Sequence, residues 1–421
     1  MAPAAPDLDE YRAAVERLLT GGGADPALFT PDAVTGLAAA GPALRPLARF
    51  AAEGLLRAAS AADVAEAEEM ARLPLVAGPD GPVAAADVDL LLAAEPDAAR
   101  RRELGAARLR VLESHVAGSL ADAAARRDEA ARGAGAASAL ALVAGAAGVD
   151  GDTARDGAAR LLDSTDDAHA RALDALARDA LGISAAALDA ADLPRLTSAP
   201  DLEEALPGGG ATAAAARTRE GMELAGVVVP APAAERLGAY AEALRGTGAT
   251  LARAGAAPRL PVEARLLPDP ALAGAAARLF EGLLGEPAWA ARVLGATDPD
   301  ALARTAQAAG LLGLRATAAR VAALGSADPE GMGRALGVRW PEVLTAADPL
   351  TGLGPLDDLR ARALAAALAA HLRETHGPRW FGDPRAGAFL REIWLEGGRI
   401  DPEELARELG APGLDPAPLA G

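Results

Sequence analysis

The most informative segment of this chain is Tyr240-Ala-Glu-Ala-Leu-Arg-Gly-Thr-Gly-Ala-Thr-Leu-Ala-Arg-Ala-Gly255. Apolar residues recur at helical spacing from Leu237 to Leu251, which predicts an apolar helix over residues 233–252. At its centre lies Arg245-Gly-Thr-Gly-Ala249, where two glycines weaken one turn. By itself this is an ordinary alanine-rich helix, and its surroundings make it informative.

Most of the remaining chain is also expected to be helical, because apolar residues recur three and four positions apart between Pro and Gly residues. The other expected helices cover residues 8–19, 64–71, 98–132, 154–181, 270–284, 299–322, 356–373 and 402–409. One strand is expected over Met222–Pro230, which is rich in β-branched Val and ends in Pro. The expected fold class is therefore mainly α, with at most one small β-sheet.

The most specific pattern is the C-terminal tail, Ala370-His-Leu-Arg-Glu-Thr-His-Gly-Pro-Arg-Trp-Phe-Gly-Asp-Pro-Arg-Ala-Gly-Ala-Phe-Leu-Arg-Glu-Ile-Trp-Leu-Glu-Gly-Gly-Arg-Ile400, followed by Asp401–Gly410 and Leu414–Leu419. This tail resembles the thimet oligopeptidase/oligoendopeptidase family of zinc metallopeptidases, which are gluzincins. Upstream, the resemblance is carried by 283–289, which looks like the helix end after the family's third-ligand segment, and by 125–132 and 160–169.

The resemblance implies a two-lobed helical, zincin-like architecture whose lobes flank a deep channel for extended peptides. Pro and Gly residues interrupt the helices near residues 193–211, so a boundary between lobes is expected there. We therefore expect an N-terminal helical lobe over residues 1–205. A C-terminal lobe over residues 206–421 would resemble the peptidase catalytic domain.

The metal site implied by the resemblance lacks its ligands. An H-E-x-x-H helix places two His on one face to bind zinc, and its Glu activates the bound water. The first His falls on Arg245, the Glu on Gly246 and the second His on Ala249. The third ligand, a Glu on the next helix, falls on Gly274 when Glu281 matches the family's second Glu. We therefore expect a degenerate member with no metal, no cofactor and no catalytic residue at these positions.

Other catalytic groups are also missing. The family stabilises its oxyanion with Tyr side chains, but the corresponding region, residues 348–360, contains no Tyr. The whole chain has only Tyr11 and Tyr240 and no Cys. Neither a G-x-S-x-G elbow nor a G-x-x-x-x-G-K-[ST] loop occurs.

The four His residues offer no replacement metal site, because their spacing does not place them together. His371 and His376 are five apart, which puts them on different helical faces, and Gly377-Pro378 follows directly. We expect both at the surface of a helix C-terminus, where a partly protonated imidazole suits the helix dipole. His115 and His169 are expected at solvated helix positions.

Composition narrows the classes of partner. A net charge of −18 and a pI near 4.8 argue against nucleic acid, which is bound through clustered positive charge. The longest uncharged run, residues 133–149, is too short for a membrane span. The N-terminus shows no signal peptide, so a cytoplasmic protein is expected. All 41 Lys/Arg positions are Arg and Asn is absent, which points to a high-GC, actinobacterial genome.

The large aromatic residues gather in the tail. Trp380, Phe381, Phe389 and Trp394 hold four of the nine Trp and Phe residues of the chain. Clustered large apolar groups are usually core, so we expect these to be buried; the alternative is an aromatic docking surface.

Two classes of function follow from the sequence. The first is a non-catalytic homologue, a pseudoenzyme that binds a peptide or protein partner. The second is an enzyme, either a residual peptidase or hydrolase or a new activity in the old cleft. A drifting paralogue without a defined role is a third hypothesis. The sequence specifies neither the partner nor the oligomeric state.

Overall fold

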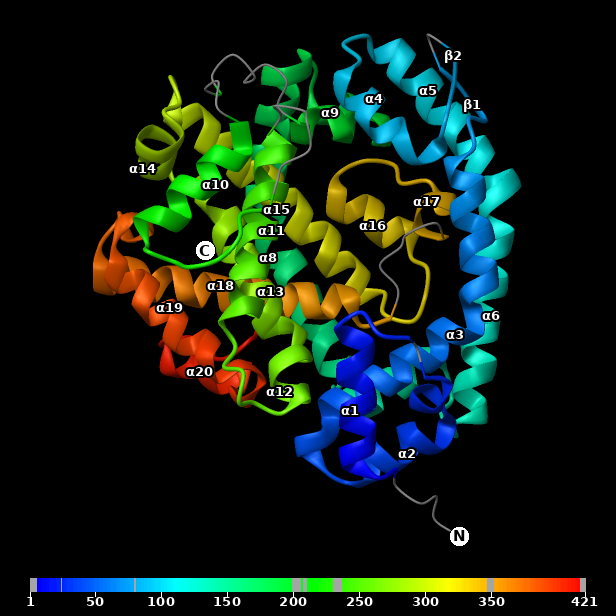
Figure 1. Ribbon diagram of the computed structural model, residues 1–421. Helices are drawn as coiled ribbons and strands as arrows, with labels where there is room; N and C mark the ends of the chain where they lie inside the picture. The colour runs from blue at the N-terminus through cyan, green and yellow to red at the C-terminus, as the bar shows by residue number, and fades with distance from the viewer. Residues whose placement is uncertain are drawn as a thin grey trace.

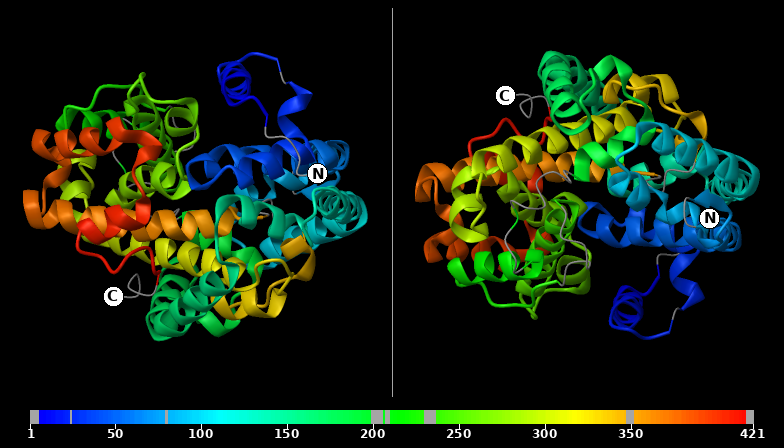
Figure 2. Two further views of the ribbon diagram at one scale, coloured as in Figure 1. Left: turned by 90° about the horizontal axis from the view of Figure 1, so that it is seen from below. Right: turned by 90° about the horizontal axis from the view of Figure 1, so that it is seen from above.

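The computed structural model describes residues 6–23, 25–78, 81–198, 206, 210–229, 237–346 and 352–416. Nearly all regular structure in these residues is helical, so the prediction of a mainly α fold with at most one small sheet is confirmed. Figures 1 and 2 show the blue and cyan N-terminal helices grouped on one side and the green, orange and red helices on the other. None of the described helices is long and apolar enough to cross a membrane.

The first half of the chain forms nine α-helices: α1 (Leu8–Leu19), α2 (Pro31–Ala39), α3 (Arg45–Arg72), α4 (Val88–Ala94), α5 (Ala98–Val111), α6 (Ala117–Gly133), α7 (Ala139–Ala147), α8 (Gly151–Leu181) and α9 (Leu193–Ser198), counted over the described residues. The long α3 packs against α2, α6 and α7. A π-helical turn, η4 (Leu112–Val116), joins α5 to α6 where one continuous helix was expected.

The second half contains α10 (Gly210–Gly221), α11 (Leu237–Gly255), α12 (Val262–Leu266), α13 (Pro270–Gly282), α14 (Pro287–Trp289), α15 (Pro299–Ala322), α16 (Pro329–Leu336), α17 (Glu342–Ala346), α18 (Gly354–His376), α19 (Pro384–Glu396) and α20 (Pro402–Glu408). Here α13 lies between α11 and α18 and packs on both. Because α15 also contacts α18 and packs along α8, it ties the two halves together.

Short turns complete the regular structure. They are η1 (Pro26–Phe29), η2 (Pro42–Leu44), η3 (Ala85–Asp87), η5 (Ala185–Ala187), η6 (Ala190–Asp192), η8 (Leu283–Gly285), η9 (Ala290–Leu294), η10 (Trp380–Gly382) and η11 (Gly397–Arg399). Within the described residues, the strands are β1 (Val76–Gly78) and β2 (Gly81–Val83), an antiparallel pair in which Val76 lies opposite Val83.

Helix starts follow local capping chemistry. The Asp7 side chain accepts hydrogen bonds from the backbone N–H groups of Asp9 and Glu10 at the start of α1. At the start of α15, Asp298 caps the first turn and Pro299 occupies its first position. Both helices have the bounds predicted from the sequence, because the signals that set them lie within a few residues of each end.

The prediction of a strand over Met222–Pro230 is wrong for residues 222–229, which are described. They form a turn and an irregular segment, in which the backbone N–H of Val229 donates to Thr247 Oγ1 on α11 at 3.2 Å. Three consecutive valines favour extended backbone, but a strand also needs a paired neighbour. Here the neighbouring element is a helix, which offers a side-chain acceptor in place of a second strand.

The core is divided into several clusters of buried residues. The largest lies within residues 206–414, between α10, α11, α13, α18 and α19. A second cluster combines N-terminal residues such as Val15 and Leu47 with Val321 on α15 and Leu359 on α18. Helices from both halves therefore share buried surface. The boundary between lobes 1–205 and 206–421 stays a prediction.

The aromatic residues of the tail are core residues, as predicted. Trp380, Phe381 and Trp394 are 1%, 3% and 7% exposed. Phe389 packs against the same cluster, and its ring stacks on His371 with centroids 4.9 Å apart. The alternative of an aromatic docking surface is excluded for the three buried side chains.

Candidate functional site

The site lies next to a close crossing of α11 and α13. Gly248 on α11 lies so near α13 that an added Cβ would be 2.4 Å from the carbonyl oxygen of Ala276. Only glycine permits this approach, because any side chain there would collide with backbone. The crossing holds Arg245, three residues earlier on α11, within reach of α13.

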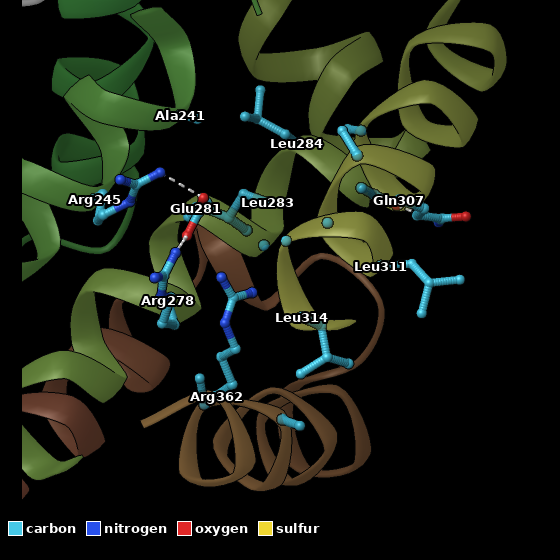
Figure 3. A pocket seen from close by; sticks show the side chains of 18 of the residues that line it. Ala241, Arg245, Arg278, Glu281, Leu283, Leu284, Gln307, Leu311, Leu314 and Arg362 are labelled. Carbon is cyan, nitrogen blue, oxygen red and sulfur yellow. Dashed lines mark hydrogen bonds and ion pairs between the residues drawn. The ribbon is translucent and has the colours of Figure 1, made fainter. Parts of the chain in front are cut away.

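Two arginines share one carboxylate next to this crossing. Arg245 Nη2 donates to Glu281 Oε1 at 2.7 Å, and Arg278 Nη1 donates to Glu281 Oε2 at 2.5 Å. Arg278 and Glu281 are three residues apart on α13, a spacing that brings side chains together on a helix. The Glu281 carboxylate therefore links α11 to α13 (Figure 3).

A second carboxylate extends the ion pairs to α18. Arg278 Nε donates to Asp358 Oδ1 at 2.7 Å, and Arg362 Nε donates to Asp358 Oδ2 at 2.9 Å. The buried hydroxyl of Thr317 on α15 also donates to Asp358 Oδ2, at 3.1 Å. Arg245, Glu281, Arg278, Asp358 and Arg362 thus form one network, here called the arginine network, across three helices.

Burial and charge oppose one another in this network. Burial alone would raise the pKa of Glu281 and of Asp358, but the neighbouring arginines outweigh it and lower both pKa values. Burial lowers the pKa of Arg362, and the attraction of Asp358 only partly offsets this effect. Both carboxylates are therefore ionised at neutral pH, while the charged form of Arg362 is less favoured than that of Arg278, whose pKa is raised.

The arginine network lines one end of a cavity of about 960 Å³. Figure 3 shows Arg245, Arg278 and Arg362 pointing toward the space beside Glu281, with leucines from the η8 turn and α15 on the other walls. Five arginines and three carboxylates line the cavity: Arg245, Arg278, Arg320, Arg362, Arg373, Glu281, Glu286 and Asp358. Its walls therefore carry an excess of positive charge although the whole chain is strongly acidic.

This cavity adjoins two others. The larger, about 1370 Å³, lies between α4, α5 and α9 and is lined by apolar side chains that include Leu109, Leu112 and Trp340. The third, about 700 Å³, lies between α3, α6 and α15. Arg320 on α15 borders all three, so the cavities meet at this residue. These three neighbouring cavities are here called the channel.

The structure separates the four positions singled out from the sequence. Arg245 lines the cavity and joins the arginine network. Gly246 lies against the Val229 side chain, and Gly274 lies against Ala361 on α18. Ala249 is half-buried, one turn beyond Arg245. Arg245 is thus brought to the cavity, while both glycines are packed against other segments.

The His residues are placed differently from one another. His115 is exposed, as expected. The expectation of a solvated His169 is wrong: it is 5% exposed, and burial together with the nearby Arg315 lowers its pKa. His371 and His376 are half-buried near the end of α18, and His376 Nδ1 is 3.8 Å from Asp383. The described residues contain no group of three or more His, Asp or Glu placed to hold a metal ion.

Sequence reasoning did not single out Arg278, Asp358, Arg362 or Thr317. The sequence does contain a signal for ion pairs. Opposite charges lie three or four residues apart in otherwise Ala- and Leu-rich helices, Arg278 with Glu281 and Asp358 with Arg362. That spacing predicts pairs within one helix. It does not predict that two such pairs face each other.

Comparison with known proteins bears on the fold. No protein-family model matches the chain, and no curated protein is found to match it. Among solved structures, the chain is similar to "PZ PEPTIDASE A with inhibitor 2", with a TM-score of 0.63 over 98% of this chain and 85% of that chain. The two sequences are 12% identical, so the likeness establishes the fold alone. The predicted mainly helical, peptidase-like fold is thereby confirmed.

Proposed function

We propose that the chain is a non-catalytic homologue of an oligopeptidase-type zinc metallopeptidase, which binds a peptide or protein partner in its channel. The observation that carries the proposal is the arginine network, because it occupies the place where the resemblance puts the first zinc ligand. An ion pair between Arg245 and Glu281 joins α11 to α13, the helix on which the resemblance places the third ligand.

The side chains at the implied ligand positions do not suit zinc. A guanidinium group has only hydrogen-bond donors and stays protonated, so Arg245 repels a cation. Neither Ala249 nor Gly274 has a side-chain N, O or S atom that could bind zinc. Zinc sites need three or four N, O or S ligands, and we therefore derive no catalytic step through a metal.

The size and the lining of the channel favour ligand binding as the function of a protein without the metal site. Its three cavities provide more than enough room for several residues of an extended peptide, and their walls combine apolar surface with a few charged groups. A strongly acidic chain does not favour nucleic acid as the partner. A cytoplasmic location stays a prediction, as does the high-GC bacterial source that the composition indicates.

The proposal is tested by measuring metal content, cleavage and binding on one preparation. The purified protein is dialysed against micromolar zinc and analysed for bound metal, and a pool of quenched fluorescent peptides is added at high protein concentration. We expect no stoichiometric zinc and no increase in fluorescence. The same peptides without the quencher should gain fluorescence anisotropy on binding.

An active zinc peptidase carried through the same steps serves as the positive control. One zinc per chain together with metal-dependent cleavage would overturn the proposal in favour of an enzyme. Absence of both cleavage and peptide binding would contradict a peptide-binding channel.

A further inference from the structure

The cavity at the arginine network has the charge of an anion site within an acidic protein. Five arginines face three carboxylates on its walls, while the chain as a whole has a net charge of −18. A recess whose walls carry a net charge of one sign attracts ions of the opposite sign. The ligand group favoured at this end of the channel is therefore negatively charged.

The arginines of the arginine network differ in how many of their N–H groups donate hydrogen bonds. Arg278 is used by two carboxylates, Glu281 and Asp358. Arg245 gives Nη2 to Glu281, whereas its Nε is buried and, among the described residues, has no hydrogen-bond partner. That nitrogen has almost no exposed surface, so an acceptor in the cavity would meet the remaining part of the guanidinium group, on a side chain that is 44% exposed.

Arg362 is a second group that could bind an anion. It donates Nε to Asp358, and Figure 3 shows its guanidinium group turned into the cavity below Glu281. Burial and the nearby Arg278 destabilise the charged form of Arg362 more than Asp358 and Glu281 stabilise it, so the pKa of Arg362 is lowered. A guanidinium group nevertheless stays charged at neutral pH, so a second acceptor beside it would be favourable.

The other walls limit which anion fits. Ala241, Leu283, Leu284, Leu311 and Leu314 line the same cavity. Aliphatic walls exclude water and strengthen an ion pair formed at their edge. They also provide contacts for an apolar side chain next to the charge. A planar carboxylate on an apolar residue matches both features, because a guanidinium fork binds carboxylates in the same plane.

From these features, and resting on the proposed function, we propose that Arg245 and Arg362 bind a carboxylate of the peptide that occupies the channel. The carboxylate belongs either to the C-terminus of the peptide or to an acidic side chain. The apolar residues that precede it extend toward the cavity lined by Leu109, Leu112 and Trp340, which adjoins this one at Arg320, Gly238 and Thr197.

The test compares three N-acetylated hexapeptides of the same apolar sequence by fluorescence anisotropy. The first ends in a free carboxylate, the second in an amide, and the third is an amide whose last residue is Glu. We expect the free acid to bind about tenfold or more tightly than the plain amide, as for a charge-assisted hydrogen bond. Added NaCl should reduce this difference. The third peptide distinguishes a terminal from a side-chain carboxylate.

Two variants assign the effect to the site. Arg245→Gln removes a half-exposed cation and leaves Glu281 paired with Arg278, so the protein should fold. It should abolish the preference for the carboxylate. Arg253→Gln, on the same helix at an exposed position, is the matched control and should retain that preference.

The outcomes separate this proposal from the proposed function. If the acid and the plain amide bind equally, or Arg245→Gln keeps the preference, the carboxylate site is overturned while the peptide-binding channel stands. If none of the three peptides binds, the proposed function itself is contradicted, and the carboxylate site with it.

Discussion

Arg245 Nη2 lies 2.7 Å from Glu281 Oε1, so that an ion pair connects α11 to α13 at the end of the cavity. The two side chains are 44% and 23% exposed, and water therefore screens their attraction to about 1 kcal/mol or less. The pair contributes little to stability by itself. Its consequence is positional, because it holds a guanidinium group at the edge of the channel.

The first prediction concerns the crossing that places Arg245. An added Cβ at Gly248 would lie 2.4 Å from the backbone oxygen of Ala276, so α11 and α13 would have to separate. Gly248→Ala should destabilise the protein by about 1 to 3 kcal/mol, as overpacking does. Gly238→Ala, on the same helix with open space around it, is the control. Chemical denaturation measures both, and equal midpoints would contradict the close crossing.

The second prediction concerns a buried ion pair in the N-terminal half. Arg101 and Asp192 are 1% and 0% exposed, with Nε 2.7 Å from Oδ1. Arg101→Met leaves a buried carboxylate without its cation and should cost about 3 to 5 kcal/mol of unfolding free energy. The exposed neighbour provides the control, Arg102→Met, which should change little.

A second variant tests the cause of that loss. Adding Asp192→Leu to Arg101→Met removes the unpaired charge, and stability should partly return because apolar pairs often replace buried ion pairs without loss. A double variant less stable than Arg101→Met alone would show that other lost contacts, such as the hydrogen bond from the Asp189 N–H to Asp192, outweigh the unpaired carboxylate.

The third prediction concerns pH. Burial and Arg315 on α15 lower the pKa of His169 below its ordinary value of 6.5, while a backbone hydrogen bond to Leu336 and the charge of Asp166 oppose this. The unfolded chain therefore takes up a proton first as the pH falls, and stability should decline from pH 6.5 down to the lowered pKa. In His169→Leu this decline should be absent, whereas in His115→Gln, at an exposed position, it should persist. Thermal melts between pH 5 and 8 measure it, and parallel curves for all three proteins would contradict the prediction.

The fourth prediction concerns the aromatic core of the tail. Trp394 is 7% exposed and its Cβ faces Gly255 on α11 so closely that a Cβ there would be 2.7 Å away. Trp394→Ala should cost about 3 to 5 kcal/mol, as for other buried aromatic truncations. Leu395→Ala removes a 47% exposed side chain from the next position and should have a small effect. Similar melting of the two variants would place the indole ring outside the core.

Local signals in the sequence were sufficient to predict the bounds of some helices and the burial of some side chains. The bounds of α1 and α15 follow from a capping Asp, a first-turn Pro in α15, and an apolar period of 3.6 residues. The burial of Trp380 and Trp394 follows from the cost of exposing large apolar surface. The resemblance of the tail to oligopeptidases also anticipated the architecture that the structural comparison supports.

Other features depend on partners that are distant in the sequence. Residues 222–229 have the composition of a strand but lie beside a helix, because β-branched residues do not specify the neighbour that a strand requires. His169 is buried because α15 and α16 close over it, which a pattern within α8 does not reveal.

The candidate site shows the same division between local and tertiary information. The amino-acid sequence alone determines that Arg245, Ala249 and Gly274 supply no zinc ligand, since that is a property of the side chains themselves. It also determines the charge pairs Arg278–Glu281 and Asp358–Arg362, which lie within single helices. Only the packing of α11, α13 and α18 brings these pairs together around one cavity, because helical periodicity specifies which face of a helix is buried but not which helix covers it.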